Sequence, residues 1–377
     1  MKLLYVANTR FPSERAHATQ IAHMCQAFSQ LGNEVTLVTN DRTKATLRDI
    51  ERWIGFVPNF SFIQIRFGIV FAPTIILTFL LNHLVFTFLL TRQLKLSEAD
   101  VIYTRDEWLC YFLSFVVPKH KLVFESHEAK YNFALRKLVE MKIKIICISQ
   151  GVLNEYLHRN IPSAQMTVAY DGIDDGFFTS VEDRTATRER LGLPQNARVV
   201  MYIGGFDKWK GVECFFKASE YVSQVMFSVI GGKPDEISLY KMKYPKVIFL
   251  GSHPYRNLKN NQQAADILVI PNSNETDLGA RYASPLKLFA HMASNVPILV
   301  SNVPSVSTVL SDKEATFFQP DNAHAMAATI EHMFGDYAVA QTKAKRAYQK
   351  SQHYSWKNRA KKIIDFLTKG NTFSRFS

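Results

Sequence analysis

The stretch Arg281–Val300, RYASPLKLFAHMASNVPILV, decides the fold. It predicts a loop, a helix with one apolar face, a tight connection at Asn295, which tolerates the left-handed conformation, and a short buried strand. Ser284 is a good N-cap and Pro285 suits the first helical position. A helix start that also carries Lys287 offers backbone N–H groups, a positive dipole end, a hydroxyl and an ammonium to an anion. On these residues alone, an ordinary capped helix remains the alternative.

The composition limits the classes of protein to consider. The chain has 377 residues, 47% of them hydrophobic, a formal net charge of +12 and a pI near 9.4. This length predicts two domains, and the charge favours an anionic partner such as nucleic acid, a phosphorylated small molecule or an acidic membrane surface. The four cysteines have no paired spacing, which indicates a reducing, cytoplasmic compartment without disulfides or a zinc site. The first 39 residues do not read as a secretory signal peptide.

Both halves of the chain alternate apolar runs with helical patterns, which predicts two Rossmann-like domains with a cleft between them. The first domain is expected over 1–178, the second over 179–354, and a C-terminal helix at about 355–370 is expected to pack back on the first. The first predicted βαβ unit lacks G-x-G-x-x-G, which argues against a dinucleotide cofactor. Expected strands lie at 2–7, 35–39, 60–66, 100–106, 121–128, 144–149, 167–170, 197–203, 226–230, 247–250, 266–270 and 296–300.

The segment Phe67–Thr91 contains no charged residue and is long enough to span a bilayer. Pro73, Asn82 and the interspersed threonines argue against a spanning helix, so the prediction is a helix buried in the domain or lying with one face against lipid headgroups. If it touches lipid, the double substitution Phe79→Glu and Phe86→Glu should move the protein from membrane to soluble fractions.

Several short motifs, in order and spacing, resemble the GT-B glycosyltransferases, and among them the retaining family 4 enzymes. The resemblance extends over nearly the full chain and implies the GT-B fold, with two Rossmann-like domains whose parallel sheets face across a cleft. The motifs are Arg10–Ala18, Val101–Arg105, Phe124–His127, Ala169–Asp174, Tyr202–Gly211, Ala264–Pro271, Ser284–Phe289 and Tyr354–Trp356.

The resemblance implies that the second domain holds a nucleotide-sugar donor and the first domain meets the acceptor. His127, at a strand end, would approach the sugar, and Lys210 would bind the departing phosphate, so both are the candidate catalytic residues. Arg105 and Glu128 would each position the acceptor or pair across the cleft, and Arg10 is a third acceptor-binding candidate. The donor-binding candidates are Gly204, Gly205, Lys210, Gly251, Ser252, His253, Ser284, Pro285 and Lys287.

Three positions depart from the family pattern. The family's ribose-binding glutamate falls at Ala290, its partner acid at Tyr282, and its loop arginine at Gly205. Loss of the ribose carboxylate removes a charge-assisted hydrogen bond of about 1.5–3 kcal/mol, or about ten to a hundredfold in affinity. His291 points about a quarter-turn away and is no obvious substitute.

These residues together predict a metal-independent, retaining glycosyltransferase that uses a UDP- or GDP-sugar and no cofactor. The expected acceptor is a glycan or lipid-linked intermediate of cell-surface polysaccharide or glycoconjugate biosynthesis, reached in the cytoplasm or at the inner face of the membrane. A degenerate, non-catalytic protein that binds a nucleotide sugar or a partner glycosyltransferase is the alternative, and a sugar-nucleotide epimerase is a weaker one. Nucleic-acid binding is disfavoured because aromatic residues are not interleaved with basic runs.

Overall fold

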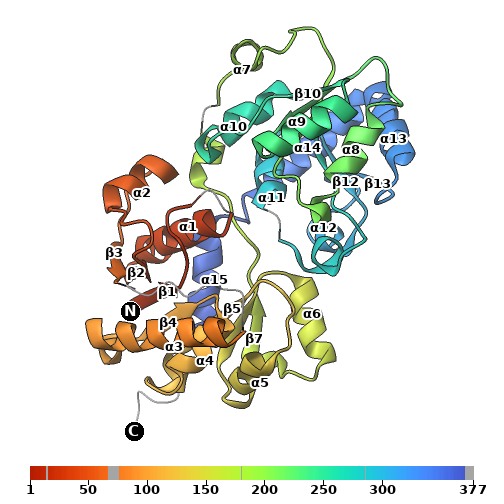
Figure 1. Cartoon of the computed structure of the whole chain (residues 1–377). Coiled ribbons are helices and arrows are strands. Elements are labelled where there is room, and N and C mark those ends of the chain that lie inside the picture. Colours follow the sequence, from red (N-terminus) through yellow and green to blue (C-terminus); the bar gives the residue numbers. More distant parts are fainter. Residues whose placement is uncertain (14–15, 67–75, 180, 285, 370–377) are drawn as a thin grey trace. The chain divides into compact units, whose positions relative to one another are not determined.

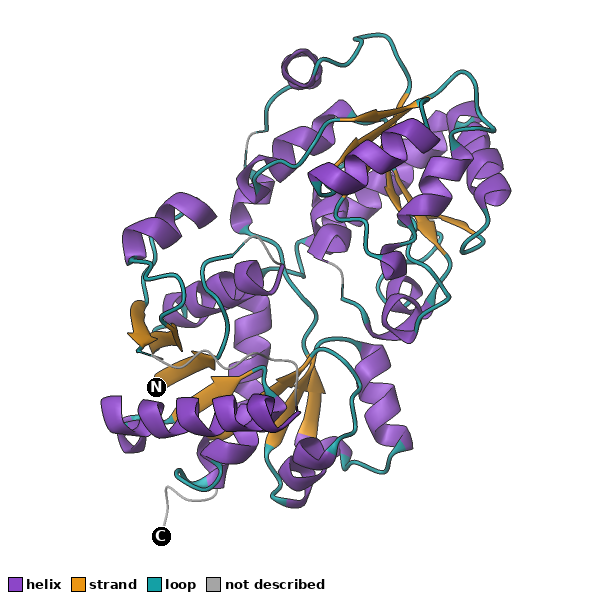
Figure 2. Cartoon of the chain, in the orientation of Figure 1, coloured by secondary structure: helices purple, strands orange, loops and turns teal. Residues whose placement is uncertain are grey.

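The computed structural model describes residues 1–13, 16–66, 76–179, 181–284 and 286–369. They form two compact units (Figure 1). The first unit contains Met1–Tyr170 and the segment that starts at Trp356, and the second contains Asp171–Ser355. Each unit is built on one sheet whose paired strands are all parallel, and Figure 2 shows helices on both faces of each sheet.

The sheet of the first unit has the strand order β3-β2-β1-β4-β5-β6-β7. Its strands are β1 (Lys2–Ala7), β2 (Glu34–Asn40), β3 (Ser61–Ile65), β4 (Val101–Thr104), β5 (Leu122–Ser126), β6 (Lys144–Cys147) and β7 (Met166–Val168). Its helices are α1 (Ala16–Gln30), α2 (Leu47–Ile54), α3 (Ile76–Gln93), α4 (Glu107–Leu113), α5 (Phe133–Glu140), α6 (Gln150–His158) and α15 (Trp356–Thr368). Within the unit α15 packs against α1.

The central strands are buried on both faces, as parallel strands covered by helices must be. All four residues of β4 and all five of β5 are buried. The order of strands turns back between β1 and β4, so polar residues that follow these strands meet at one edge of the sheet. Arg105 follows β4 there, and His127 follows β5.

The sheet of the second unit has the order β10-β9-β8-β11-β12-β13. Its strands are β8 (Val199–Ile203), β9 (Met226–Ile230), β10 (Val247–Phe249), β11 (Ile267–Ile270), β12 (Ile298–Ser301) and β13 (Thr316–Phe318). Its helices are α7 (Arg184–Leu191), α8 (Val212–Ala218), α9 (Pro234–Lys243), α10 (Leu258–Asn261), α11 (Leu286–Ala293), α12 (Pro304–Ser307), α13 (Ala323–Gly335) and α14 (Tyr337–Ser351).

The stretch Arg281–Val300 forms the predicted helix α11, turn and strand β12. Asn295 adopts a φ of 58°, which confirms the left-handed connection. The strand runs from Ile298 to Ser301, one or two residues later than predicted. Phe289 and Met292 are completely buried, so the apolar face of α11 contributes to the core of the second unit.

Helix α3 begins in the uncharged segment Phe67–Thr91 and ends two residues beyond it, at Gln93; residues 67–75 lie outside the described part of the chain. His83 ties α3 to α4, because its Nε2 lies 2.6 Å from Oδ2 of Asp106, the N-cap of α4. Among the described residues, no helix combines the length and the apolar character needed to cross a membrane. The choice of Phe86 as a lipid-facing residue is wrong, because its side chain is completely buried.

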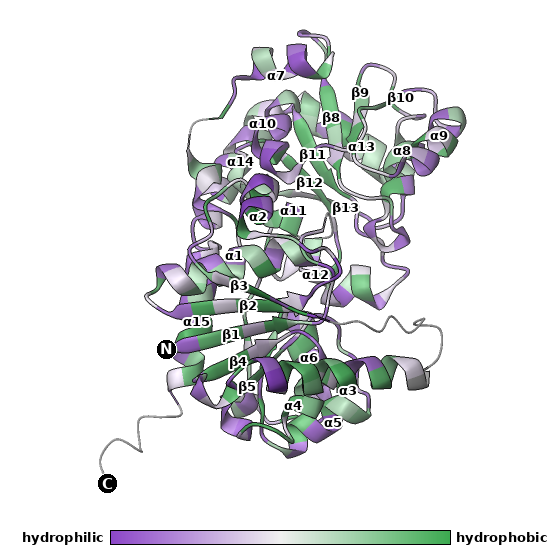
Figure 3. Ribbon diagram, turned by 60° about the vertical axis from the view of Figure 1, so that its left-hand side comes forward, coloured by the Kyte–Doolittle hydropathy of each residue, from purple (hydrophilic) through white to green (hydrophobic). Residues whose placement is uncertain are grey.

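The outward face of α3 is instead marked by Leu84 and Phe88, which are 51% and 55% exposed. The helical period explains the error: Phe86 is half a turn from Leu84 and Phe88, so it faces the sheet when they face solvent. Figure 3 shows hydrophobic segments on α3, α4 and α5, and α4 packs against both α3 and α5.

Candidate functional site

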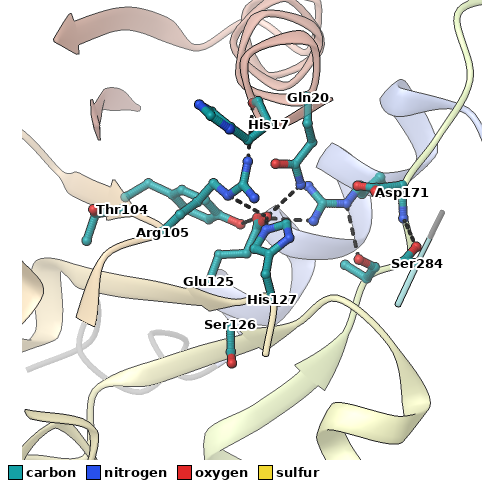
Figure 4. Close-up of polar contacts among 12 residues, drawn as sticks. His17, Gln20, Thr104, Arg105, Glu125, Ser126, His127, Asp171 and Ser284 are labelled. Carbon is teal, nitrogen blue, oxygen red and sulfur yellow. Dashed lines mark hydrogen bonds and ion pairs between the residues drawn. The ribbon is translucent and has the colours of Figure 1, made fainter. Parts of the chain in front are cut away.

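The end of β5 brings Glu125 and His127 together. Residues two apart on an extended strand share a face, and Nε2 of His127 lies 2.5 Å from Oε1 of Glu125 (Figure 4). Nε2 therefore carries a proton and donates a hydrogen bond to the carboxylate, which leaves Nδ1 as the acceptor of the ring. Burial, followed by the charge of Arg105, lowers the pKa of His127 to about 4, so the imidazole is neutral near pH 7.

Glu125 is a completely buried carboxylate surrounded by donors. Arg359 of α15 lies 3.1 Å from its Oε2, Gln20 of α1 donates to Oε1 at 2.6 Å, and the hydroxyl of Tyr103 donates to Oε2. Burial acts to raise the pKa of Glu125, but the charge of Arg359 and the hydrogen bond from the imidazole outweigh it and hold the pKa well below its usual range. The carboxylate is therefore ionised and fixes the ring of the predicted catalytic histidine.

Arg105 and Glu128, two of the three predicted acceptor residues, line one pocket of the first unit together with His127. Arg105 donates from NH1 to the carbonyl oxygen of His17 at 3.2 Å, and Glu128 pairs with Lys130 at 2.8 Å. Arg10, the third predicted residue, is exposed on the loop after β1 and is not among the residues that line this pocket.

In the second unit, the glycine-bearing loop that follows β8 holds Lys210. Its Nζ lies 2.5 Å from Oδ2 of Asp207, and its side chain is 21% exposed. A Cβ at Gly205 would lie 3.1 Å from Nζ of Lys210 and 3.3 Å from Oδ2 of Asp207, so this ion pair closely approaches the position of the missing family arginine. Gly211 has a φ of 62°, and a Cβ there would lie 2.0 Å from the carbonyl oxygen of Pro271, so this turn requires glycine. Gly204, with a φ of 153°, joins the loop to the end of β8.

Lys287, on the first turn of α11, points its ammonium into the same region. Among the described residues its buried Nζ has no hydrogen-bond partner, and it lies 4.4 Å from the ring centroid of Tyr202, a cation–π contact. The hydroxyl of Tyr202 donates to the carbonyl oxygen of Gly205 at 2.6 Å, which connects this ring to the glycine loop. Burial, followed by the charge of Lys210, lowers the pKa of Lys287 well below its usual range. A buried ammonium beside a second lysine is a suitable place for an anion.

The remaining predicted donor residues directly precede α11 in the sequence or follow β10, the edge strand of this sheet. Ser284 accepts a hydrogen bond on Oγ from the backbone N–H of Asp171 at 3.1 Å, and Pro285 lies outside the described residues. Gly251, with a φ of 78°, and the exposed Ser252 follow β10. His253 contacts the carbonyl oxygen of Leu250 through Nε2 at 3.2 Å and the amide of Asn261 through Nδ1 at 3.1 Å.

The position of the missing ribose carboxylate is buried. Ala290 is 1% exposed, and the neighbouring His291 is completely buried, where its Nδ1 accepts a hydrogen bond from Gln262 at 2.7 Å. His291 therefore belongs to the interior of the second unit.

Sequence reasoning missed Glu125, Arg359 and Tyr202. The strand period could have identified Glu125, since it precedes His127 by two residues on the same face. Nothing in the sequence near Arg359 indicates a contact with β5.

Comparison with known families identifies both parts of the chain. A family model described as Glycosyltransferase Family 4 matches residues 17–177, and one described as Glycosyl transferases group 1 matches residues 197–336.

Curated relatives and solved structures agree with these matches. The chain is 24% identical to an uncharacterized glycosyltransferase of Methanocaldococcus jannaschii over 59% of each chain. It is 23% identical to a D-inositol 3-phosphate glycosyltransferase of Corynebacterium urealyticum over 54% of this chain and 50% of the relative. The chain thus spans about half to three fifths of the length of these relatives.

The similarity to solved structures extends over the whole chain. Sucrose-phosphate synthase from Thermosynechococcus elongatus is 17% identical and superposes with a TM-score of 0.78 over 99% of this chain and all of its own. HepE from Anabaena, solved in complex with UDP-glucose, is 16% identical and superposes with a TM-score of 0.72 over 98% of this chain and all of its own. These values establish the fold.

Proposed function

Because the chain belongs to the group 1 glycosyltransferases of GT-B fold, we propose that it transfers a sugar from a nucleotide-sugar donor to a glycan or lipid-linked acceptor. The observation that carries the proposal is the buried ammonium of Lys287, which lacks a partner among the described residues and lies in the region of Lys210. A diphosphate would supply the missing negative charge. The complex of HepE with UDP-glucose favours a uridine diphosphate sugar as donor.

The proposed reaction retains the configuration of the anomeric carbon. The bond from this carbon to the diphosphate oxygen breaks, and the acceptor oxygen bonds to the carbon on the same face. The proton of the acceptor hydroxyl passes to the departing phosphate oxygen. Lys210 and Lys287 stabilise the charge that develops on the diphosphate, which is the work of a divalent ion in metal-dependent transferases. His127 contributes Nδ1 as a hydrogen-bond acceptor for a hydroxyl of the acceptor sugar.

A thermal-shift screen against UDP, GDP, ADP and their common sugar conjugates tests the donor site, because a ligand that binds only the folded protein raises its stability. We expect stabilisation by one base, unchanged by EDTA and lost in Lys210→Ala. Lys208→Ala is the matched control, since Lys208 lies in the same loop, is 80% exposed and pairs with Glu275. No shift with any nucleotide would overturn the proposal.

A non-catalytic nucleotide-sugar binder is the second candidate, favoured by Ala290 and Gly205, which replace the family's ribose and phosphate ligands. Incubation with the stabilising sugar nucleotide and chromatographic detection of free nucleotide separate the two. Binding without transfer or hydrolysis would favour the non-catalytic protein.

We also propose that the first unit touches an anionic membrane surface, where a lipid-linked acceptor would be found. Leu84, Phe88, Phe115 and Phe133 are 44–66% exposed on or next to the adjacent helices α3, α4 and α5. Arg92 lies 5.5 Å from the ring centroid of Phe88, and Lys137 lies 5.8 Å from that of Phe133. Basic groups over exposed rings suit the headgroup region of anionic lipids.

Flotation with vesicles of anionic lipids tests this surface. Leu84→Ser with Phe88→Ser should move the protein to the soluble fraction, and Leu239→Ser, an exposed leucine of the second unit, should not. Equal flotation of the double variant and the wild type would remove the membrane proposal.

A further inference from the structure

The pocket at the carboxyl ends of β4 and β5 has a volume of about 100 Å³ and lies in the first unit. Its lining residues include His127 and four residues with charged side chains, Arg105, Glu107, Glu128 and Lys130. The polar groups of this wall determine which class of molecule it can hold.

The charges of the pocket cancel. Two are positive and two are negative, and the imidazole is neutral near pH 7 because the pKa of His127 is about 4. Lys130 pairs with Glu128 at 2.8 Å, and Arg105 lies 4.0 Å from the buried carboxylate of Glu125. A phosphate or a carboxylate would therefore meet cations that already have anionic neighbours. This differs from Lys287 in the second unit, whose ammonium has no hydrogen-bond partner among the described residues.

The pocket nevertheless presents many hydrogen-bonding groups. Carboxylate oxygens of Glu107 and Glu128 and Nδ1 of His127 accept, while the ammonium of Lys130 and the guanidinium of Arg105 donate. The hydroxyl of Tyr156 is oriented by Ser126, whose Oγ lies 2.7 Å away. A hydroxyl both donates and accepts, and neighbouring hydroxyls of a sugar ring can therefore bridge such alternating acceptors and donors.

We propose that this pocket binds an uncharged sugar ring, the terminal unit of the acceptor, and selects it over a phosphorylated or acidic one. Its role in transfer rests on the proposed glycosyltransferase function. Glu107, Glu128 and Lys130 recognise the ring through its hydroxyls. Nδ1 of His127 accepts a hydrogen bond from one further hydroxyl. The side-chain amide of Asn132 donates a hydrogen bond to Oε1 of Glu107 at 2.8 Å. The carboxylate of Glu107 is therefore already oriented in the ligand-free protein.

Saturation-transfer NMR on the full chain tests the selectivity. The probes are the methyl glycosides of glucose, galactose and mannose, set against glucose 6-phosphate, galactose 6-phosphate and inorganic phosphate. UDP is present at saturation so that the donor site is filled. We expect at least one methyl glycoside to receive saturation and its 6-phosphate to bind more weakly.

The double variant Glu107→Gln with Glu128→Gln changes the charge of the pocket from zero to +2. It should weaken the binding of the methyl glycoside by about tenfold and strengthen the binding of the sugar phosphate, because each lost carboxylate removes a charged acceptor. Glu140→Gln is the matched control, since Glu140 pairs with Lys137 and is not among the lining residues. It should change neither affinity.

Three results would overturn the inference: tighter binding of the phosphates by the wild type, no binding of any methyl glycoside, or glycoside binding unchanged in the double variant. Each can occur while UDP still stabilises the protein, in which case the donor-site proposal survives. Conversely, glycoside binding without any nucleotide binding would preserve the sugar pocket and overturn the proposed transferase function.

Discussion

Oε1 of Glu125 lies 2.5 Å from Nε2 of His127, at the end of one buried strand. The pair is completed by Arg359, which α15 brings to 3.1 Å from the other carboxylate oxygen. A single buried carboxylate thus orients the predicted catalytic ring and anchors the C-terminal helix of the first unit. The site and the stability of this unit therefore depend on the same group.

Removal of the carboxylate should be costly to the fold. Glu125→Gln leaves Arg359 without its countercharge, and we expect a loss of about 3–5 kcal/mol in the free energy of unfolding, because a buried charge then lacks a partner. Urea denaturation of Glu125→Gln, Arg359→Met and the double variant measures the coupling. The double variant should be less destabilised than the sum of the single variants.

The partly buried Glu155 pairs with the exposed Arg159 at 2.8 Å and provides the comparison. Glu155→Gln should cost less than about 1 kcal/mol. Strict additivity of the two buried substitutions would contradict the proposed coupling between Glu125 and Arg359.

Acid should destabilise the second unit through His291. Burial lowers the pKa of His291 to about 3, whereas an unfolded histidine has a pKa near 6.5, so between these values the unfolded chain binds more protons. Stability therefore falls as pH falls, by about 2 kcal/mol between pH 6.5 and pH 5. Urea denaturation at both pH values should show a smaller loss in His291→Gln, while the exposed His332→Gln should behave as the wild type. An equal loss in His291→Gln and the wild type would contradict this origin.

Lys287 should oppose folding and favour binding. Lys287→Met removes a buried ammonium that has no hydrogen-bond partner among the described residues, and we expect the ligand-free protein to become more stable by about 1–3 kcal/mol. The same substitution should weaken UDP binding by about tenfold or more, since a charged hydrogen bond is lost. Thermal unfolding without and with UDP measures both effects. A variant that loses stability and keeps UDP affinity would show that Lys287 is a structural residue.

The turn after Lys210 should not tolerate a side chain. In Gly211→Ala the new Cβ meets the carbonyl oxygen of Pro271 at 2.0 Å, so the loop must move, and we expect losses in both stability and nucleotide affinity. Gly192→Ala is the control, because Gly192 has a similar φ of 66° and an empty surrounding. It should cost only the left-handed strain of about 1–2 kcal/mol. Equal effects of the two substitutions on nucleotide affinity would show that the turn at Gly211 does not position the donor site.

Much of the architecture could be predicted because its signals are local. Val101–Thr104 reads as a buried parallel strand, and Asn295 reads as a left-handed connection, since apolar runs and backbone tolerance are properties of neighbouring residues. Helix α3 shows the limit of such signals. Its uncharged sequence did not show that Phe86 is buried and Phe88 exposed, because the face that a helix buries depends on what packs against it.

The residue pattern predicts the two parallel-sheet units, the strand ends that bear His127 and Arg105, and the loop that bears Lys210. It does not predict that Glu125 is shared by His127 and Arg359, or that the ammonium of Lys287 is buried over Tyr202, because these contacts join residues far apart in the chain. The side-chain periodicity of helices and strands and the residue preferences of turns depend on residues close in the chain. Burial and charge compensation depend on residues that meet only after the sheets and helices have packed.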